Sequence, residues 1–229
     1  MKAECSIAVV VPVLNERALL PALLERLHAL PADEVVIVDG GSTDGTCQML
    51  EDSTIRWISC AAGRANQMNA GASVTGADIL LFIHSDTEIS SSCFEAVQRA
   101  MQDAATVAGR FDIRFSGKHP LLRMIAWFIN TRSRLTLIST GDQCLFVRRS
   151  RFEATGGFPS QPLMEDIEFT KRLKRQGHIA CLREQVTTSS RRWEKHGILK
   201  TVMLMWRLRL LYFFGVPAGD LASMYRQVR

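Results

Sequence analysis

The chain has 229 residues, 47% of them hydrophobic, and a net charge of +5. This length supports one substantial domain and leaves too little chain for two. No helix-turn-helix, zinc-finger or RNA-binding signature accompanies the basic residues, which argues against nucleic acid as a partner. The six cysteines are scattered without a Cys-x-x-Cys pair, so we expect reduced, mostly buried thiols in a cytoplasmic protein rather than a zinc site.

Positive charge is concentrated in the C-terminal quarter of the chain. Residues 1–168 carry 15 Lys and Arg against 20 Asp and Glu, a net charge of −5, whereas residues 169–229 carry 13 against 3, a net charge of +10. Basic segments of this kind meet anionic lipid, phosphate-bearing ligands or nucleic acid. Because the nucleic-acid signatures are missing, a phosphate ligand or a membrane surface is the better interpretation.

The first half of the chain alternates between strand-like and helix-like runs. Its first apolar run is too short to span a membrane and lacks the small-residue cleavage site of a secretion signal, so it predicts a strand. The predicted strands are Ile7–Val11, Glu34–Val38, Ile55–Ser59 and Ile79–Ile83, and the predicted helices are Ala18–Leu30, Thr46–Glu51 and Ala65–Ala72. This order predicts a parallel sheet with helices on both faces and ligands at the carboxyl ends of the strands.

Polar side chains follow three of these predicted strands. Asn15 and Glu16 come after the first strand, Asp39 comes directly after the apolar run of the second, and residues 84–86 (His-Ser-Asp) follow the fourth. Taken alone, Asp39 fits equally well a simple strand-to-helix turn with a capping side chain. Three polar strand ends at one edge of a sheet are more simply explained by a ligand site.

The second half of the chain is less regular. The expected elements are strands at Val107–Phe115, Cys144–Val147 and Ile179–Leu182, a helix at Pro120–Arg134, and a basic amphipathic helix at Ile167–Gln176. No repeat or low-complexity linker marks a boundary. We therefore expect one domain over residues 1–195 and a C-terminal helical segment, not an independent domain, over residues 196–229.

The apolar segment Ile198–Val216 allows two interpretations. It contains Lys200, Arg207 and Arg209, and charges near its centre would cost about 2.5–3.5 kcal/mol each in a spanning helix, so we do not expect it to cross a membrane. A helical projection places Lys200 and Arg207 on one side and Arg209 far round the other. The helix either rests on a membrane interface or a partner, including a second copy of the chain, or packs on the body of the protein.

Several charged residues suit transfer chemistry. Asp86 at a strand end is a hard oxygen ligand for a divalent cation, which in turn clamps a diphosphate. The pair Glu165-Asp166, which follows a Gly-Gly-Phe-Pro turn, can accept a proton from an incoming hydroxyl group, with simple helix capping as the alternative. Residues 191–193 (Arg-Arg-Trp) either hold phosphates through two guanidiniums or form a solvated basic loop anchored by the indole.

The order of these motifs resembles the family 2 glycosyltransferases of GT-A fold. The match runs from about Ser6 to Trp193, and it rests on Pro12-Val13-Leu14-Asn15-Glu16, on Asp39 with the Gly-Ser-Thr-Asp-Gly-Thr that follows, on the Asp86 triplet and on Glu165-Asp166. The segments 63–72 and 141–143 are similar to those of a subgroup of small radical-SAM/selenodomain-associated transferases. The resemblance implies a Rossmann-like, mostly parallel sheet flanked by helices, followed by the apolar and basic helical segment.

The resemblance also implies an activity. It indicates an inverting glycosyltransferase that moves a sugar from a nucleotide-diphosphate donor, a UDP-sugar first of all, to a hydroxyl acceptor whose identity the sequence does not give. If the C-terminal helix meets a membrane, the acceptor is expected to be lipid-linked and the protein to sit peripherally at the inner face of the membrane. If it does not, a homodimer is the alternative partner for the apolar helix.

Each matching residue receives a role from the resemblance. The nucleotide-binding residues would be Pro12, Asn15, Glu16, Asp39, Arg64, Asn69 and Ser85. The metal ligands for Mn²⁺ or Mg²⁺ would be Asp86 and His84, and the catalytic residues would be Asp166 as general base and Glu165 nearer the acceptor. The residues facing the diphosphate or the acceptor would be Asp142, Gln143, Arg191, Arg192 and Trp193.

The sequence departs from the family pattern at two places. His84 stands where the family usually has Asp, which removes a negative charge from the metal site, although His also ligates Mn²⁺. Ser189 or Ser190 stands where processive members have the Gln of Gln-x-x-Arg-Trp, which argues against a polymerase.

Rival interpretations have less support. A nucleotidyltransferase would need a Gly-rich, Arg-containing loop after the first strand, but residues 12–17 contain no glycine, and P-loop and G-x-G-x-x-G patterns are absent. A non-catalytic, membrane-docked relative that binds nucleotide-sugars is supported by His84 alone. The joint presence of Asp39, Asp86 and Asp166 argues against it.

Overall fold

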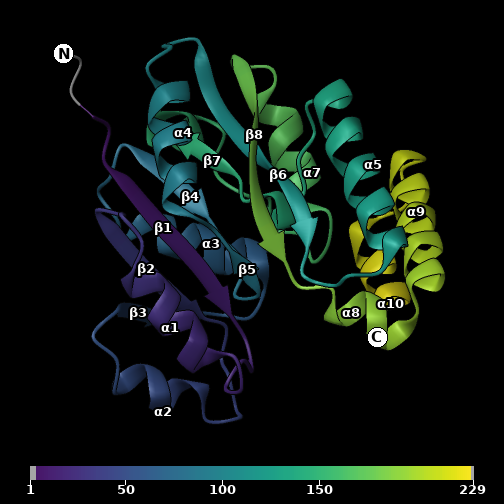
Figure 1. The fold of residues 1–229 in the computed structure, drawn as a ribbon, viewed down its shortest axis with the longest axis horizontal. Helices are drawn as coiled ribbons and strands as arrows, with labels where there is room; N and C mark the ends of the chain where they lie inside the picture. The colour runs from purple at the N-terminus through teal and green to yellow at the C-terminus, as the bar shows by residue number, and fades with distance from the viewer. Residues whose placement is uncertain (1–3, 228–229) are drawn as a thin grey trace.

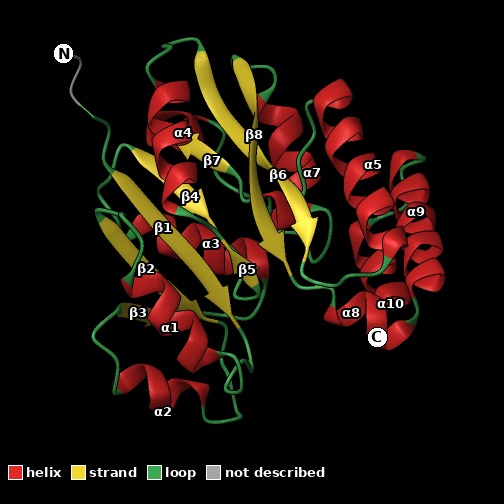
Figure 2. Cartoon of the chain, viewed as in Figure 1, coloured by secondary structure: helices red, strands yellow, loops and turns green. Residues whose placement is uncertain are grey.

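The protein, described here by a computed structural model over residues 4–227, contains an eight-stranded mixed sheet enclosed by helices (Figure 1, Figure 2). In spatial order the strands are β3 (Arg56–Ser59), β2 (Glu34–Asp39), β1 (Ile7–Val13), β4 (Ile79–Phe82), β7 (Phe146–Arg148), β6 (Thr106–Phe115), β8 (His178–Thr188) and β5 (Thr87–Glu88). The pairs β3–β2, β2–β1, β1–β4 and β6–β8 are parallel. Strand β7 runs antiparallel to both β4 and β6 and joins the two parallel halves.

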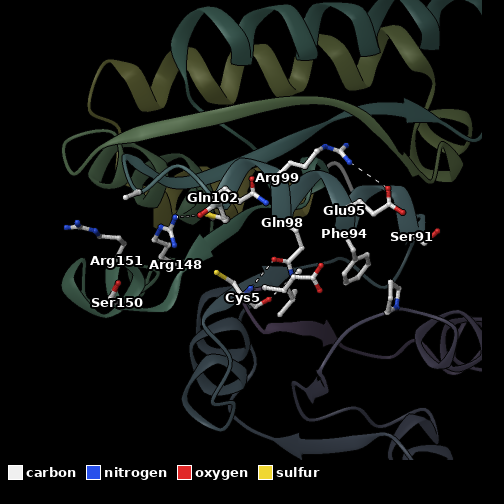
Figure 3. A pocket seen from close by; sticks show the side chains of 15 residues that line it. Cys5, Ser91, Phe94, Glu95, Gln98, Arg99, Gln102, Arg148, Ser150 and Arg151 are labelled. Carbon is white, nitrogen blue, oxygen red and sulfur yellow. Dashed lines mark hydrogen bonds and ion pairs between the residues drawn. The ribbon is translucent and has the colours of Figure 1, made fainter. Parts of the chain in front are cut away.

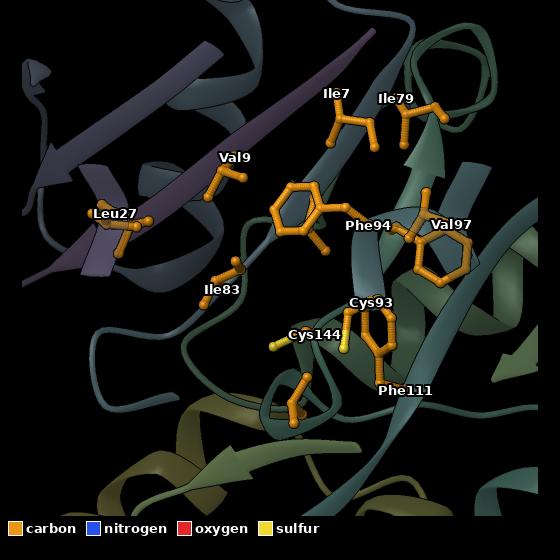
Figure 4. Close-up of a cluster of buried hydrophobic side chains, with 14 of the residues drawn as sticks. Ile7, Val9, Leu27, Ile79, Ile83, Cys93, Phe94, Val97, Phe111 and Cys144 are labelled. Atoms are coloured by element: carbon orange, nitrogen blue, oxygen red, sulfur yellow. The ribbon is translucent and has the colours of Figure 1, made fainter. Parts of the chain in front are cut away.

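Two hydrophobic cores lie on the two faces of this sheet. The face carrying Val9 and Val11 of β1 packs against α1 (Leu20–His28), α2 (Thr46–Glu51), α4 (Ser91–Met101) and α5 (Pro120–Thr136). The face carrying Ala8 and Val10 packs against α3 (Arg64–Ser73), α6 (Arg149–Ala154) and α7 (Glu165–Leu173). Alternate residues of β1 therefore enter opposite cores, which explains its uninterrupted apolar sequence. Figure 4 shows the first core, in which Phe94 and Val97 of α4 accompany Ile7 and Val9.

The sequence-based prediction of a mostly parallel α/β sheet is confirmed. The four predicted strands and three predicted helices of the first half lie where they were expected, with ends shifted by a few residues. Strand β8 is longer than the predicted run because its second half, which contains Arg183 and Glu184, is kept in the sheet by pairing with β6 and β5. Helix α4 was not predicted.

Helix α3 approaches the sheet closely because Gly71, on the side of the helix that faces the sheet, has no side chain. A Cβ atom on Gly71 would lie 2.4 Å from Cγ1 of Val10 and 2.9 Å from Cγ2 of Val38. Glycine at this position lets the helix rest directly on β1 and β2. The N-terminal end of α3, where Arg64 lies, is thereby fixed relative to the carboxyl ends of both strands.

The C-terminal segment forms three helices, of which the last two make a hairpin. These are α8 (Arg191–His196), α9 (Ile198–Phe213) and α10 (Ala218–Gln227), and α9 and α10 lie at the end of the molecule away from β3 (Figure 1). Leu208 of α9 and Leu221 of α10 are buried in a third cluster with Met164 and Ile167 at the start of α7. Of the two interpretations of this segment, packing on the body describes its inner side. The predicted single segment is divided at Gly215–Pro217.

The outer sides of α5 and α9 remain apolar and exposed. Trp206 and Phe213 of α9 are 65% and 81% exposed, and Trp127 of α5 is 61% exposed. Within residues 4–227 no helix has both the length and the apolar character needed to cross a membrane. All six cysteines are free, as expected from their spacing, but only Cys93 and Cys144 are buried, so the prediction of mostly buried thiols was wrong.

Candidate functional site

The loops that follow β1 and β2 are joined by hydrogen bonds into one surface. The N–H of Asn15 donates to the Ser42 hydroxyl at 2.8 Å, and the Asn15 side-chain oxygen accepts from the N–H of Thr43 at 2.8 Å. The N–H of Glu16 donates to the Thr46 hydroxyl. Asn15 has a left-handed backbone with φ of 54°, a conformation that Asn tolerates better than most residues. Pro12, which was also predicted to line the nucleotide site, lies in β1 and is buried.

Asp39 is the buried anchor of the second loop. Its carboxylate accepts the N–H groups of Gly41 and Ser42 at 2.7 and 2.9 Å and the hydroxyl of Ser42. Burial acts to raise the pKa of Asp39, but the hydrogen bonds from Ser42 and Gly41 outweigh it and lower the pKa, so the group is held as a carboxylate. Asp39 has no exposed surface. Direct contact with a nucleotide base therefore requires the Ser42 hydroxyl to turn away.

Gln67 is a structural residue of the site that the sequence analysis did not identify. Its side-chain amide donates to the carbonyl of Val13 at 2.7 Å and to that of Val38 at 2.8 Å, the final or penultimate residues of β1 and β2. It is buried and one helical turn from Arg64 on the same side of α3. One amide thus sets the spacing of two strand ends and the position of Arg64.

The segment after β4 brings three predicted residues to the same edge. The Ser85 hydroxyl donates to a carboxylate oxygen of Glu16 at 3.2 Å, which links this segment to the loop after β1. The His84 ring lies against Gly141, and its Nδ1 is 3.5 Å from a carboxylate oxygen of Asp142. The half-buried carboxylate of Asp86 makes no hydrogen bond or ion pair to another residue in the described part of the chain.

Arg64 faces a group of carboxylates from two other segments, which we call the carboxylate cluster: Asp142, Glu165 and Asp166. Loss of water around the guanidinium acts to lower the pKa of Arg64, but Glu165, Asp142 and Asp166 outweigh it and raise the pKa. Tyr225 of α10 also interacts with Arg64, so the C-terminal hairpin reaches this side of the site. The predicted residues Arg64, Asp142, Glu165 and Asp166 are therefore brought together, with His84 beside them.

The two carboxylates of α7 have different surroundings. Asp166 accepts the N–H of Gly141 at 2.8 Å and, through its other oxygen, the N–H of Ile167 at 2.7 Å. Glu165 is buried, and its pKa is raised by burial and by the charge of Asp166, with Arg64 acting in the opposite direction. Met164, which precedes the pair, has φ of 64°, a strained backbone for a non-glycine residue. No side chain caps α7 at its N-cap residue, Met164, whereas Asp166 accepts an N–H within the first turn and the pKa of Glu165 is raised.

Two predicted contact residues have structural roles instead. Asn69 binds the backbone of Phe158 twice, through its amide nitrogen and its oxygen, both at 2.9 Å, and so holds the Gly-Gly-Phe turn. Gln143 is fully buried, and its amide bonds to Ser133, Phe111 and the N–H of Thr140. The prediction that Gln143 faces the diphosphate or acceptor is wrong in this structure, and Asn69 supports the site rather than lining it. The sequence does not show whether an amide side chain in a loop points towards a ligand or towards the backbone.

The basic motif after β8 lies at a corner with β6. Trp193 packs edge-on against Phe115, with ring centres 5.3 Å apart, and the exposed Arg191 donates its backbone N–H to Ser189. The side chain of Arg192 lies outside the described part of the chain. The observed contacts of the motif are those of the alternative interpretation, a basic segment anchored by its indole.

The residues at the end of β4 fit a divalent cation that a phosphate ligand helps to hold. Among the described residues no group of three or more His, Cys, Asp and Glu side chains is placed to bind a metal alone. Mg²⁺, however, is usually held by one or two carboxylates together with substrate phosphates and water. The carboxylate of Asp86, free of hydrogen bonds and ion pairs to described residues, provides such a ligand, whereas His84 is packed against Gly141 and Asp142.

A separate hollow of about 770 Å³ lies at the opposite ends of the strands, beside the start of β1 (Figure 3). Its polar lining is largely engaged: Gln98 exchanges two hydrogen bonds with the backbone of Cys5, and Arg99 pairs with Glu95 and Glu184. This hollow is remote from Asp39 and the carboxylate cluster, and its contacts are those of a structural surface.

A carboxylate-bearing edge at the carboxyl ends of parallel strands is the place where open α/β sheets bind their ligands. The family described as Glycosyl transferase family 2 matches residues 8–155, and the chain belongs to this family. It is 26% identical over 142 residues to the undecaprenyl-phosphate 4-deoxy-4-formamido-L-arabinose transferase of Serratia proteamaculans (strain 568). That alignment covers 56% of this chain and 41% of the relative, so the chain spans less than half of the relative's length.

Solved structures show the same fold. TarS from S. aureus aligns with a TM-score of 0.63 and 19% identity, covering 81% of this chain and 60% of that one. The mannosyltransferase PcManGT from Pyrobaculum calidifontis, in complex with GDP-Man and Mn²⁺, gives 0.63 and 20% identity, covering 81% and 57%. Glucosyl-3-phosphoglycerate synthase from Mycobacterium tuberculosis, in complex with Mn²⁺, UDP and glucosyl-3-phosphoglycerate, gives 0.58 and 22%, covering 79% and 70%. The predicted GT-A fold is thereby confirmed, and the predicted family is confirmed by the family match over residues 8–155.

The raised pKa of Glu165 predicts a pH-dependent effect of its removal. A carboxyl group whose pKa is higher in the folded than in the unfolded state destabilises the fold once both states are ionised. We expect Glu165→Gln to raise the unfolding temperature at pH 7–8 and to have a diminishing effect as the pH falls towards the ordinary value of 4.5. Thermal unfolding across pH 4–8, with the exposed Glu153→Gln as control, measures this. A stabilisation that grows towards acid pH would contradict it.

Proposed function

We propose that the protein is an inverting glycosyltransferase that uses a nucleotide-diphosphate sugar, with a UDP-sugar as the first candidate donor. The observation that carries this proposal is the free carboxylate of Asp86, which follows β4 on the segment whose His84 lies against Asp142 of the carboxylate cluster. The solved relatives bind UDP, UDP-GlcNAc or GDP-Man, two of them in complexes with Mn²⁺, which supports a nucleotide-sugar and a divalent cation here.

The nucleotide would occupy the joined loops after β1 and β2. Asn15, Glu16 and Ser85 line this part, with Asp39 buried beneath Ser42. Asp86 would hold Mn²⁺ or Mg²⁺ at the diphosphate, and the cation would supply positive charge to the leaving group. Arg64 would face the same phosphates from the start of α3, where it already lies among carboxylates.

The transfer would be a single displacement. An acceptor oxygen attacks the anomeric carbon, the bond from that carbon to the diphosphate oxygen breaks, and the electron pair leaves with the nucleoside diphosphate. Asp166 would take the acceptor proton, because its carboxylate is aimed by the N–H groups of Gly141 and Ile167. One base and one leaving-group clamp suffice for inversion, whereas hydrolases with two catalytic carboxylates place them on both sides of the bond.

Nucleotide binding is the first test of this proposal. Calorimetric titration with UDP and GDP should show binding of one of them that tightens by about tenfold or more, roughly 1.4 kcal/mol, when Mn²⁺ is added. Asp86→Asn should remove the metal-dependent part, whereas Asp52→Asn, an exposed Asp at the end of α2, should not. Failure of both nucleotides to bind under every metal condition would overturn the proposal.

The general base is the second test. Asp166→Asn should lower sugar transfer or donor hydrolysis by about 10²–10⁴-fold while donor binding stays close to that of the unchanged protein. Glu168→Gln is the matched control, because Glu168 lies in the same helical turn but pairs with Lys171 and Arg172 at the surface. If Asp166→Asn keeps activity within a few-fold, the base lies elsewhere, with Glu165 the next candidate.

We also propose that the outer sides of α5 and α9 dock on an anionic membrane. Ten large apolar side chains are exposed there, Met124, Trp127, Phe128 and Leu135 on α5 and Leu199, Met203, Trp206, Leu210, Phe213 and Phe214 on α9. The basic residues Lys200 and Arg207 are exposed on α9, within the quarter of net charge +10. Apolar burial with basic residues at its border is the pattern of interfacial helices. The Serratia relative is named for an undecaprenyl-phosphate substrate, which fits an acceptor at a membrane.

Vesicle flotation tests this docking. The protein should float with vesicles that contain phosphatidylglycerol and less with neutral phosphatidylcholine vesicles, since each basic residue near an anionic surface contributes about 1 kcal/mol. The double change Phe213→Ser and Phe214→Ser should reduce flotation with unchanged nucleotide binding. Equal recovery with both vesicle types, or dimerisation through this face without any flotation, would remove the membrane proposal.

A further inference from the structure

Two arginines near Asp166 lack the partners that buried arginines usually have. The first is Arg132 in the last turns of α5, whose Nε and Nη2 are buried and donate to no acceptor among the described residues. The second is Arg209 in α9, whose Nε is likewise buried and donates to no described acceptor. Neither side chain makes a hydrogen bond or ion pair to another described residue. Both residues are half-buried, and a buried guanidinium nitrogen without an acceptor is costly, so we expect these groups to meet an anion that comes from outside the chain.

The arginine two positions along α5 shows the ordinary arrangement. Arg134 pairs with Asp112 at 2.6 Å and donates to the carbonyls of Cys181 and Leu182. Its guanidinium is thereby used to join α5 to β6 and β8. Arg132, on the same helix, makes no such contacts with described residues. Its charge interacts instead with the positive charge of Arg209.

Arg132 and Arg209 are close enough for their charges to interact. The pKa of Arg132 is lowered to about 10, first by burial and then by the charge of Arg209, while Asp166 acts in the opposite direction. Two like charges that interact repel, and an anion bound by both would convert this repulsion into attraction. Arginine forks match the oxygens of phosphate and hold them by charge-assisted hydrogen bonds.

The packing of α9 fixes this pair beside the proposed base. Leu208, next to Arg209, is buried in one cluster with Met164 and Ile167, which flank the Glu165-Asp166 pair. Arg209 therefore leaves α9 at the level of the first turn of α7, and its Nε is buried. The C-terminal helix thus delivers a positive charge to an edge of the site that otherwise carries the carboxylate cluster.

We propose that Arg132 and Arg209 form a subsite for a phosphate monoester on the acceptor, next to Asp166. This inference rests on the proposed function and adds the chemical class of the acceptor. The donor diphosphate has its own place near Asp86 and Arg64, so the second phosphate belongs to the molecule that receives the sugar. A phosphate monoester occurs both on small soluble metabolites and on lipid carriers, and the two arginines would recognise the group they share.

Inorganic phosphate is the direct probe of this subsite. With UDP and Mg²⁺ present to fill the donor part, phosphate should raise the unfolding temperature in a saturable manner. Arg132→Gln and Arg209→Gln should each weaken this effect by about tenfold or more. Arg123→Gln, which removes an exposed arginine from the same helix as Arg132, should leave it unchanged.

Binding of UDP with Mg²⁺ separates the possible failures. The Gln variants could match the unchanged protein both in nucleotide binding and in their response to phosphate. In that case the proposed subsite is wrong and the proposed function stands. If the unchanged protein does not respond to phosphate, the subsite is likewise wrong. If the unchanged protein does not bind UDP with Mg²⁺ at all, the result counts instead against the proposed function itself. Arg132→Lys, which keeps charge but not the fork, should recover only part of the phosphate response if the geometry of the fork matters.

A competition experiment distinguishes the two sources of the phosphate. Dodecyl phosphate and glycerol 3-phosphate would each be tested for displacement of inorganic phosphate, with dodecanol and glycerol as uncharged controls. Preference for dodecyl phosphate supports the subsite and indicates a lipid carrier, and preference for glycerol 3-phosphate supports it and indicates a soluble acceptor. Displacement by neither phosphate ester, or equally by the alcohols, would overturn the proposal.

Discussion

The balance of charge around Arg64 is the constraint on which this site depends. Asp142, Glu165 and Asp166 come from segments about 80 to 100 residues further along the chain, and their negative charges meet at the start of α3. Without the guanidinium, a buried glutamate beside an aspartate would be held only by losing its charge. The position of Arg64 in turn depends on Gln67, which bonds to the ends of β1 and β2, and on Gly71, which lets α3 lie on the sheet. Sheet, helix and carboxylates are therefore positioned as one unit.

The parts of the structure that the sequence predicts are those decided by local pattern. The runs that form β1, β2 and β4 are short, apolar and β-branched, so few alternatives exist for them. Asp39, Asp86 and the Glu165-Asp166 pair were predicted as site residues because several carboxylates follow strands or precede a helix in one chain, although each alone also fits a capping role. The directions of Gln143 and Asn69 could not be found in this way, because an amide satisfies buried backbone groups as readily as it meets a ligand. The pairing of Arg132 with Arg209 joins residues 77 positions apart and depends on how α9 packs.

The excess of positive charge in the C-terminal quarter has two different uses in the folded protein. Lys200 and Arg207 remain exposed on α9 beside the aromatic side chains, where a charged surface would meet them. Arg209, two residues further, is half-buried, and its Nε has no exposed surface. The helical projection already placed Arg209 away from the other two, but it could not show what lay on that side. The same helix thus carries charge outward to a surface and inward to the site.

The two halves of the site differ in how far their polar groups are satisfied, and this difference bears on where ligand charge is needed. At the ends of β1 and β2, Asp39, Asn15 and Asp44 are bonded to neighbouring backbone and hydroxyl groups, so that part is preorganised without a ligand. Around α7 the protein keeps a buried Glu165 with a raised pKa and two arginines that face each other without acceptors. Uncompensated charges of this kind cost stability, and proteins retain them mainly at functional sites. A dianion bound by Arg132 and Arg209 would remove the second of these costs, so the charge of a ligand on this side of the site follows from the groups that the free protein leaves unsatisfied.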